Sequence, residues 1–459
     1  METRDVEYPP LPLNLSPDDE RSIEMIADRL VAETLHASED FTAQGRVPDP
    51  ACWKRVKEKD GMTAYQDISN TPSARRERVW SEDTVVVSAS PQNPTFYSTS
   101  NRSLQEGMFN ESFHNIDNYD SGDECSLHHD DFTRFGAKGG AEISVLEKFR
   151  PVNVPIIFSH GVFPGTVEDM AFAFLADTDE RSRTRFNTNK DNVVEDMRIL
   201  AQIHGPTKED PFRFLGIKWC TSTPSRTVSL VVKPRDYLII ESTGMALDSN
   251  GERFAYLLNH SIEMEEVPDF RDFGQVRTIF SACHIMKPHP SGEAVEAYAK
   301  GFLVIGGSFS VRIGALQMAE GLILVPRVLE ESYLKKLAWM MQDQHRWSSS
   351  SSSTSEASSS FSSSNGSKSI LEKVGTCPCC HGKLSSRRLG GFMDKISGCR
   401  LCRRAICHKC TVKKNLPVEG ARGRHMKKKE REFCLDCYIK AKKLPAWHVA
   451  VATLSNASP

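Results

Sequence analysis

The chain has 459 residues, enough for two or three domains, and 39% of them are hydrophobic, so most of it can bury a core. The formal net charge of −2 conceals an asymmetry, because residues 370–443 carry 20 Lys and Arg against 6 Asp and Glu, which leaves −16 for the remainder. No run of about eighteen apolar residues occurs, and the first thirty residues lack a signal-peptide core, so we expect an intracellular protein that does not span a membrane. We therefore expect a cytoplasmic protein whose basic end meets an anionic surface.

The first expected element is a helix within residues 1–44. Ser16 supplies an N-cap, Pro17 suits the first turn, and three acidic residues follow at the positive end of the helix dipole. One amphipathic helix with a single buried face is therefore predicted. Its apolar residues at helical spacing are Ile23, Ile26, Ala27, Leu30, Val31 and Leu35.

Short strands dominate residues 45–345. The runs TVSLVV (227–232), DYLIIES (236–242) and FAYLLNHSI (254–262) are rich in β-branched and aromatic residues, as strands are. The Asn-Gly at 250–251 suits a hairpin turn between the last two runs. Antiparallel strands are therefore expected through much of this region.

Helical spacing interrupts these strands. The stretches TVEDMAFAFLAD (166–177) and KDNVVEDMRILAQI (190–203) both carry apolar residues at i, i+3 and i+4, which predicts two helices. A third helical stripe comes late in the region, and with the strands it predicts an α+β domain. The late stripe consists of Val328, Leu329, Tyr333, Leu334, Leu337, Ala338 and Met341.

Three stretches resemble a START-type lipid-binding domain. They are WKRVKEKDGMTAYQD (53–67), VEDMAFAFLAD (167–177) and TPSRTVSLVVKPRDYLIIES (223–242), and the Arg-Asp-Tyr at 235–237 is the most telling part. The resemblance implies a curved antiparallel sheet that grips a long C-terminal helix, with a lipid in an apolar cavity between them. The late stripe would then be the gripped helix. A filled α+β core is an equally weighted alternative, since periodicity does not distinguish a filled core from a hollow one.

The sequence offers little sign of catalysis. The run CSLHHDD (125–131) gathers possible metal ligands, but it lies in a polar region and is interpreted as a solvated acidic loop. The chain contains no HExxH, GxSxG or Walker-type glycine loop. We therefore expect a protein that is not an enzyme.

A serine-rich run separates the acidic body from the cysteine-rich end. Residues 346–369 contain almost nothing apolar and are predicted to form a flexible linker. A small cysteine module is expected at 370–445, with a short tail at 446–459.

The cysteines of this module fall into four Cys-x-x-Cys pairs. Zinc takes four ligands in a tetrahedron, so four pairs supply two complete structural sites with no position left for a catalytic water. Because the module is too small for an ordinary core, metal binding should supply its folding free energy. Cys379, His381 and His408 are surplus in this scheme, and spacing alone leaves open which pairs share an ion. The predicted ligands are Cys377, Cys380, Cys399, Cys402, Cys407, Cys410, Cys434 and Cys437.

The order CRLCRRAICHKC (399–410) resembles the central block of a FYVE-type zinc finger. The resemblance implies a two-zinc cross-brace. Its first zinc would take the first and third cysteine pairs, and its second zinc the second and fourth pairs.

The lipid-binding motif of that family is only partly present. Lys395 and Arg400 match it, but Ser397 and Gly398 replace its two histidines, so headgroup specificity does not carry over. Phe392 and Met393 stand where the family places a membrane-inserting loop, although packing against the knuckles is an equal alternative. The remaining predicted anion-binding residues are Arg403, Arg404, Lys427, Lys428 and Lys429.

These features predict a non-enzymatic, membrane-associated adaptor. Its finger would dock on anionic membrane lipid, peripherally on endosomal membranes, and its START-like body would bind a lipid. The alternative is a scaffold whose basic finger binds an acidic protein. Nucleic acid is the weakest candidate partner, because few aromatic residues interleave with the charges.

Overall fold

The computed structural model describes residues 8–69, 144–186, 192–224, 233–350, 376–384, 388–389, 392–393, 397–418 and 427–455. The runs expected at 125–131 and 227–232, and the serine-rich run beyond residue 350, lie outside these residues. The chain forms two compact units, which are described separately below. The first contains the described parts of Met1–Val167, Phe174–Pro206 and Phe212–Arg327, and the second contains Glu168–Ala173, Thr207–Pro211 and those of Val328–Pro459.

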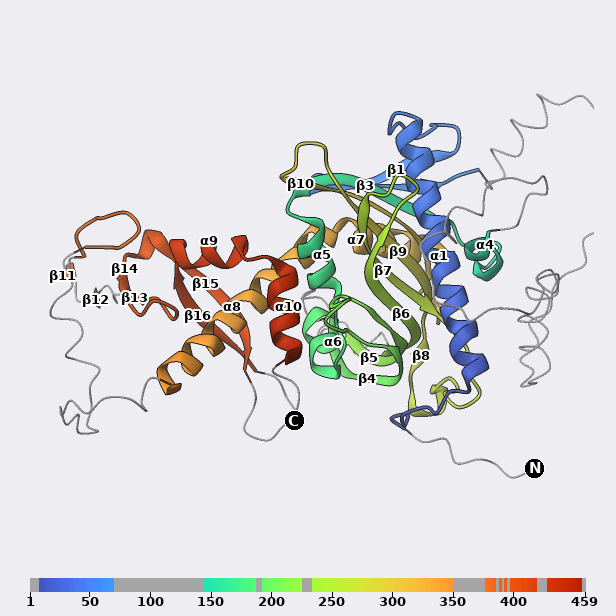
Figure 1. The fold of residues 1–459 in the computed structure, drawn as a ribbon. Helices are drawn as coiled ribbons and strands as arrows, with labels where there is room; N and C mark the ends of the chain where they lie inside the picture. Colours follow the sequence, from blue (N-terminus) through green and yellow to red (C-terminus); the bar gives the residue numbers. More distant parts are fainter. Residues whose placement is uncertain are drawn as a thin grey trace, which may run out of the picture. The chain divides into compact units, whose positions relative to one another are not determined.

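The first unit is built on one large, mostly antiparallel sheet (Figure 1). Its strand order is β1-β2-β3-β10-β9-β7-β6-β5-β4, and the short β8 runs parallel to β6. The α+β class is therefore confirmed. The strands are β1 Trp53–Lys59, β2 Met62–Asp67, β3 Ile157–Pro164, β4 Asn192–His204, β5 Phe214–Pro224, β6 Arg235–Leu247, β7 Arg253–Ser261, β8 Val276–Arg277, β9 Ile279–Pro288 and β10 Ala294–Val304.

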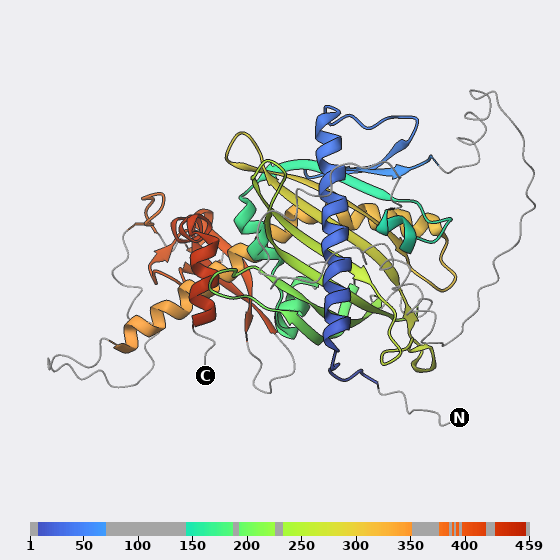
Figure 2. The ribbon, with the colours of Figure 1, turned by 45° about the vertical axis from the view of Figure 1, so that its right-hand side comes forward.

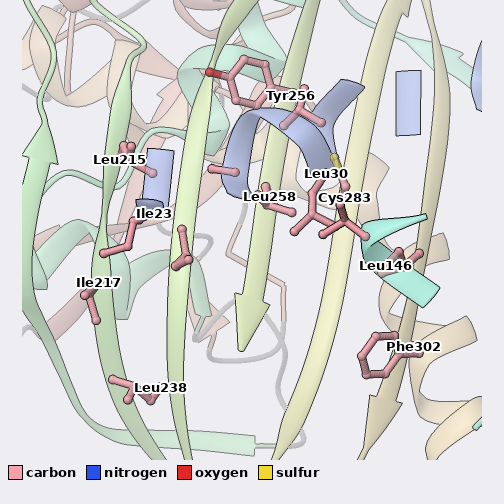
Figure 3. Close-up of a cluster of buried hydrophobic side chains, with 14 of the residues drawn as sticks. Ile23, Leu30, Leu146, Leu215, Ile217, Leu238, Tyr256, Leu258, Cys283 and Phe302 are labelled. Carbon is pink, nitrogen blue, oxygen red and sulfur yellow. The ribbon is translucent and has the colours of Figure 1, made fainter. Parts of the chain in front are cut away.

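Helix α1 (Pro17–Ala43) crosses one face of this sheet (Figure 2). Ser16 and Asp19 form a capping box at its start, as the sequence predicts, and its apolar stripe faces the strands. Figure 3 shows Ile23 and Leu30 of α1 among apolar side chains of the sheet and Leu146 of the short α4 (Val145–Phe149). The main core of this unit therefore lies between α1 and the sheet.

Helix α7 (Val311–Ile323) packs on the opposite face, against β1, β2, β3 and β10. Gly301 of β10 faces this helix, since a Cβ there would lie 2.4 Å from the terminal methyl carbon of Met318. Phe302, the next residue, turns into the core under α1. The sheet thus holds a helix, as the START resemblance implies, but this helix precedes the expected one.

The apolar stripe at 328–341 has a different role. It lies in α8 (Val325–Ser350), where Leu337 is fully buried among the cysteines of the second unit and is joined by Leu334, Met340 and Met341. The stripe is therefore not the helix held by the sheet. Periodicity predicted the helix correctly but could not identify the surface that buries it.

This packing also moves the domain boundary. The division between the two compact units falls after Arg327, whereas the sequence predicted a domain boundary within residues 346–369. Helix α8 continues to Ser350, past the predicted start of the linker. The serine-rich run therefore connects two parts of the second unit instead of joining the two units.

One predicted helix is a strand. Residues 190–203 fall mainly in β4, which pairs with β5 along its length. Three register shifts interrupt this pairing, so the apolar residues depart from strict alternation and Met197 and Leu200 are both buried. The bulges therefore place the apolar residues of β4 at intervals that resemble those of a helix. The helix predicted at 166–177 is present as α5 (Val167–Phe174), followed by α6 (Asp179–Phe186).

The second unit combines α8 with small antiparallel hairpins. Its core unites Leu337 with Leu401, Ile406, Phe433 and five buried ligand cysteines. The elements are β11 Arg388–Leu389, β12 Phe392–Met393, β13 Ser397–Gly398, β14 Ala405–Ile406, β15 Thr411–Val418, β16 Lys427–Cys434, α9 Leu435–Lys443 and α10 Ala446–Ser455.

A buried polar network ties α5, α8 and α9 together within this unit. Lys336 Nζ lies 2.5 Å from Asp169 Oδ1 and donates to the Lys442 carbonyl at 3.2 Å, while Ser332 Oγ donates to Asp169 Oδ1 at 2.6 Å. The side chains of Lys336 and Asp169 are 1% and 7% exposed, so each charge depends on the other for its compensation.

We expect Asp169→Ala to destabilise the second unit by about 3–5 kcal/mol, because it leaves the Lys336 ammonium buried without a counter-charge. Denaturant unfolding followed by circular dichroism measures this loss. The double variant Asp169→Leu/Lys336→Met should recover most of it. Equal destabilisation by both variants would show that packing, and not charge compensation, sets the cost.

Candidate metal centre and buried polar row

The eight predicted cysteines gather into two groups of four. One contains Cys377, Cys380, Cys407 and Cys410, and within each group all the sulfur atoms lie within 4.8 Å of one another. This is the interleaved pairing that the FYVE resemblance implies. The second group contains Cys399, Cys402, Cys434 and Cys437.

The first cysteine pair of each group lies in a tight turn of the same kind. The amide of His381 donates to the carbonyl of Cys377 at 2.9 Å, and the amide of Arg403 donates to that of Cys399 at the same distance. His381 and Arg403 have φ values of 55° and 58°, the left-handed conformation that closes each turn. The Cys-x-x-Cys spacing thus folds twice into one backbone loop, which turns both sulfurs inward.

The donor set suits zinc. Four thiolates at tetrahedral spacing favour a soft divalent ion, and a complete set of four protein ligands marks a structural site. Cys379 belongs to neither group, in agreement with the sequence analysis. The hydrogen bond between Cys437 and Cys399 lowers the pKa of the Cys399 thiol to about 4 and raises that of the Cys437 thiol.

The predicted anion-binding residues are only partly brought together. Three exposed arginines, Arg400, Arg403 and Arg404, lie within or directly after the Cys399–Cys402 turn. Arg404 hydrogen-bonds to the thiol of Cys402. The Arg400 amide donates to Glu432 on β16, and Lys429 lies three residues along that strand, about 10 Å away. Lys429 is therefore separate from the arginine group.

The other residues predicted to contact anions or the membrane lie mainly in β16 and β12. Lys427 and Lys428 begin β16, paired with Val418 and Pro417. Phe392 and Met393 form β12, which pairs with β11. Lys395 lies outside the described residues.

A second candidate site, which the sequence analysis missed, lies in the first unit. Lys218 on β5 and Glu241 on β6 have fully buried side chains, with Lys218 Nζ 2.5 Å from Glu241 Oε1. Arg185 of α6 pairs with the other carboxylate oxygen and is 9% exposed. Lys218 Nζ also donates to the Ala176 carbonyl at 2.5 Å and to Ser182 Oγ at 2.9 Å, so its three N–H groups all have partners.

The pKa values of this cluster reflect its burial. Desolvation lowers the pKa of Lys218 to about 8, although Glu241 opposes the shift. Burial pushes the pKa of Glu241 upward, but Arg185 and Lys218 outweigh it and hold that pKa below its usual value. The carboxylate is thus firmly ionised, and the ammonium is less firmly so.

Polar side chains continue from this cluster across the sheet. Glu241 stands opposite Asn259 on β7, and on the strands beyond it His284 stands opposite Ala299, which stands opposite Ser159 of β3. His284 lies diagonally from Asn259, whose direct partner is Ala282. Alternation along each strand turns these side chains away from the core under α1. We call Lys218, Glu241, Asn259, His284 and Ser159 the polar row.

Three members of the polar row have buried atoms without a partner. Among the described residues, Asn259 Oδ1, His284 Nδ1 and Ser159 Oγ accept or donate no hydrogen bond. Burial lowers the pKa of His284 to about 4, so its imidazole is neutral near pH 7. Such atoms cost free energy when they are buried without a polar partner such as water or a ligand group.

The sequence did contain a signal for the row. Lys218 interrupts the apolar strand FLGIKWC (214–220) and Glu241 interrupts YLIIES (237–242), so each is a charge inside a run predicted to be buried. The Arg-Asp-Tyr at 235–237 instead has a structural role. Asp236 accepts from Arg277 at 2.8 Å and from the Trp219 indole at 3.3 Å.

No family model and no curated protein matches the chain. Solved structures do match. Human STARD10 is 8% identical, over 71% of this chain and 81% of its own, with a TM-score of 0.31. Human StAR-related lipid transfer protein 5 is 12% identical, over 66% and 95%, with a TM-score of 0.32. A StAR-related lipid transfer protein from Xanthomonas axonopodis is 9% identical, over 61% and 96%, with a TM-score of 0.30. Similarity this low carries no functional argument.

We expect native mass spectrometry of the full chain to show two bound zinc ions. Cys377→Ser and Cys399→Ser should each lose one ion, because each removes a ligand from a different group. Cys379→Ser is the matched control and should keep both. A wild-type protein with one ion, or loss of an ion from the Cys379 variant, would contradict the assignment.

The polar row also predicts a pH dependence. The folded-state pKa of Lys218 is about 8, below the unfolded value of about 10.5, so between these pH values the unfolded state binds more protons. The stability of the wild type relative to Lys218→Met should therefore rise by about 3 kcal/mol from pH 8 to pH 10.5. Urea unfolding of both proteins measures the difference. A constant difference across that range would show that Lys218 stays charged.

Proposed function

We propose that this protein is a non-enzymatic lipid-binding adaptor, in which the first unit binds a lipid at the polar row and the second is a FYVE-related zinc finger that docks on anionic membrane. The buried unpaired atoms of the polar row are the observation that carries the first half of the proposal. The two four-cysteine groups and the basic surface around them support the second half.

The chemistry of the polar row specifies the ligand in part. Asn259 Oδ1 is an acceptor, so the ligand offers a hydroxyl or amide hydrogen there. Neutral His284 can accept or donate. The Lys218 ammonium already donates to three protein oxygens, so the ligand would contact Asn259, His284 and Ser159. Apolar neighbours in adjacent strand positions, such as Leu257 and Ala282, suit a hydrocarbon body. These groups favour a lipid with a small hydroxyl or amide head over one with a cationic head.

The finger supports membrane docking through charge. The knuckle arginines and the lysines of β15 and β16 would be attracted to an anionic leaflet by about 1 kcal/mol each. Because Ser397 and Gly398 replace the histidines of the family motif, binding should follow total anionic lipid and fall with salt, with little preference for one phosphoinositide isomer.

The lipid site is tested by Asn259→Leu in the full chain, with a fluorescent sterol and a fluorescent ceramide as probes. We expect uptake to fall about tenfold, while the free energy of unfolding stays level or rises by about 1–2 kcal/mol, because an unpaired buried acceptor is removed. His260→Leu is the matched control. His260 is also buried and has an unpaired Nε2, but it faces the opposite side of the sheet.

Two results would contradict the lipid site. One is a wild-type protein that takes up neither probe and carries no lipid after purification. The other is an Asn259 variant that binds both probes as the wild type does. Either would favour a filled core with a protein-scaffold role.

A further inference from the structure

Helix α9 carries an exposed apolar pair in the middle of a basic surface. Leu435 is 42% exposed and Ile439 is 40% exposed, although most large apolar side chains of this unit are buried. The two stand at i and i+4, so they are neighbours on one helix face. The opposite face of α9 carries the ligand Cys437 and Ala441 into the core.

Lysines surround this pair. Lys443 lies one helical turn after Ile439. Lys440 follows Ile439 directly, Lys442 stands three residues after it, and all three lysines are exposed. Within the described residues, neither Lys440 nor Lys443 forms an ion pair. Lys442 stacks on the rings of Tyr333 and Tyr438, at 4.7 and 5.9 Å from their centroids, which holds its charge near the same face. Asp436 is the one acidic residue of the helix.

We propose that this α9 face, defined by Leu435, Ile439 and Lys443 with Lys440 at its border, is the surface by which the protein binds an anionic lipid leaflet. The inference rests on the proposed membrane docking and assigns it to a surface other than the predicted loop at Phe392 and Met393. The apolar pair enters the interface between head groups and acyl chains, and the lysines lie at the depth of the anionic head groups.

The positive charge of this face favours an anionic leaflet over a second copy of the chain as its binding partner. A second copy of the chain would bring the same lysines together and be repelled. An anionic leaflet complements the lysines and also accepts the two aliphatic side chains, as with other interfacial helices. Helix α9 is already packed on the core through Cys437 and Ala441, so docking requires no ordering of the helix.

The test uses the full-length, zinc-loaded protein and phosphatidylcholine vesicles that contain phosphatidylserine at about 30 mol%. We expect Leu435→Ser/Ile439→Ser and Lys440→Glu/Lys443→Glu each to weaken sedimentation with vesicles by about tenfold or more. The salt dependence should become shallower only in the lysine variant, because only that variant removes screened charges. Zinc content confirms that each variant is folded.

Matched controls come from the first unit. Val152→Ser changes an aliphatic residue that is 87% exposed, and Lys54→Glu/Lys59→Glu reverses two exposed lysines of β1. Both should bind vesicles as the wild type does. Ile439→Trp provides a gain that misfolding cannot imitate, because a Trp side chain at this position should tighten binding.

The outcomes separate this inference from the proposal on which it rests. Wild-type protein that ignores anionic vesicles overturns membrane docking as a whole. Wild-type protein that binds, together with α9 variants that bind equally well, overturns the α9 face alone. Variants that change the sedimentation coefficient of the free protein, and not vesicle binding, would identify the face as a contact between copies and also overturn it.

Discussion

The second unit depends on bringing eight thiolates together. Five of these cysteines are also part of its buried core, beside Leu337, Leu401 and Phe433. Four thiolates held within 4.8 Å repel one another unless a cation lies between them. A metal ion bound at either group would therefore stabilise the core of this unit and the elements packed on it.

Helix α8 is the clearest case of this dependence. Its apolar stripe is covered by the cysteine core, and the network of Lys336, Asp169 and Ser332 fixes it to α5 and α9. A finger tethered by a long linker would leave that stripe exposed to water. The second unit therefore includes a helix and part of α5 that a sequence boundary would assign to the preceding domain.

The first unit shows a different arrangement on the two faces of one sheet. The face under α1 is a dense apolar core, whereas the opposite face carries α7 and the polar row. The buried charges of Lys218 and Glu241 compensate each other, whereas Asn259, His284 and Ser159 have atoms without a partner. The polar row thus marks the face on which a ligand would contribute most, because it would satisfy atoms that the protein itself leaves unpaired.

The sequence by itself determined the α+β class, the capped N-terminal helix and the eight cysteines that gather into two groups. These are local properties, because capping, strand composition and Cys-x-x-Cys turns depend on residues within one or two turns of the chain. Only the tertiary structure decided which helix the sheet holds, where the units divide and which polar side chains share a face. The apolar stripe at 328–341 does not indicate which surface buries it. The apolar spacing of β4 resembles that of a helix, and only its pairing with β5 shows that bulges produce this spacing. Lys218, Asn259 and Ser159 are far apart in the sequence, and strand pairing alone brings them into one row.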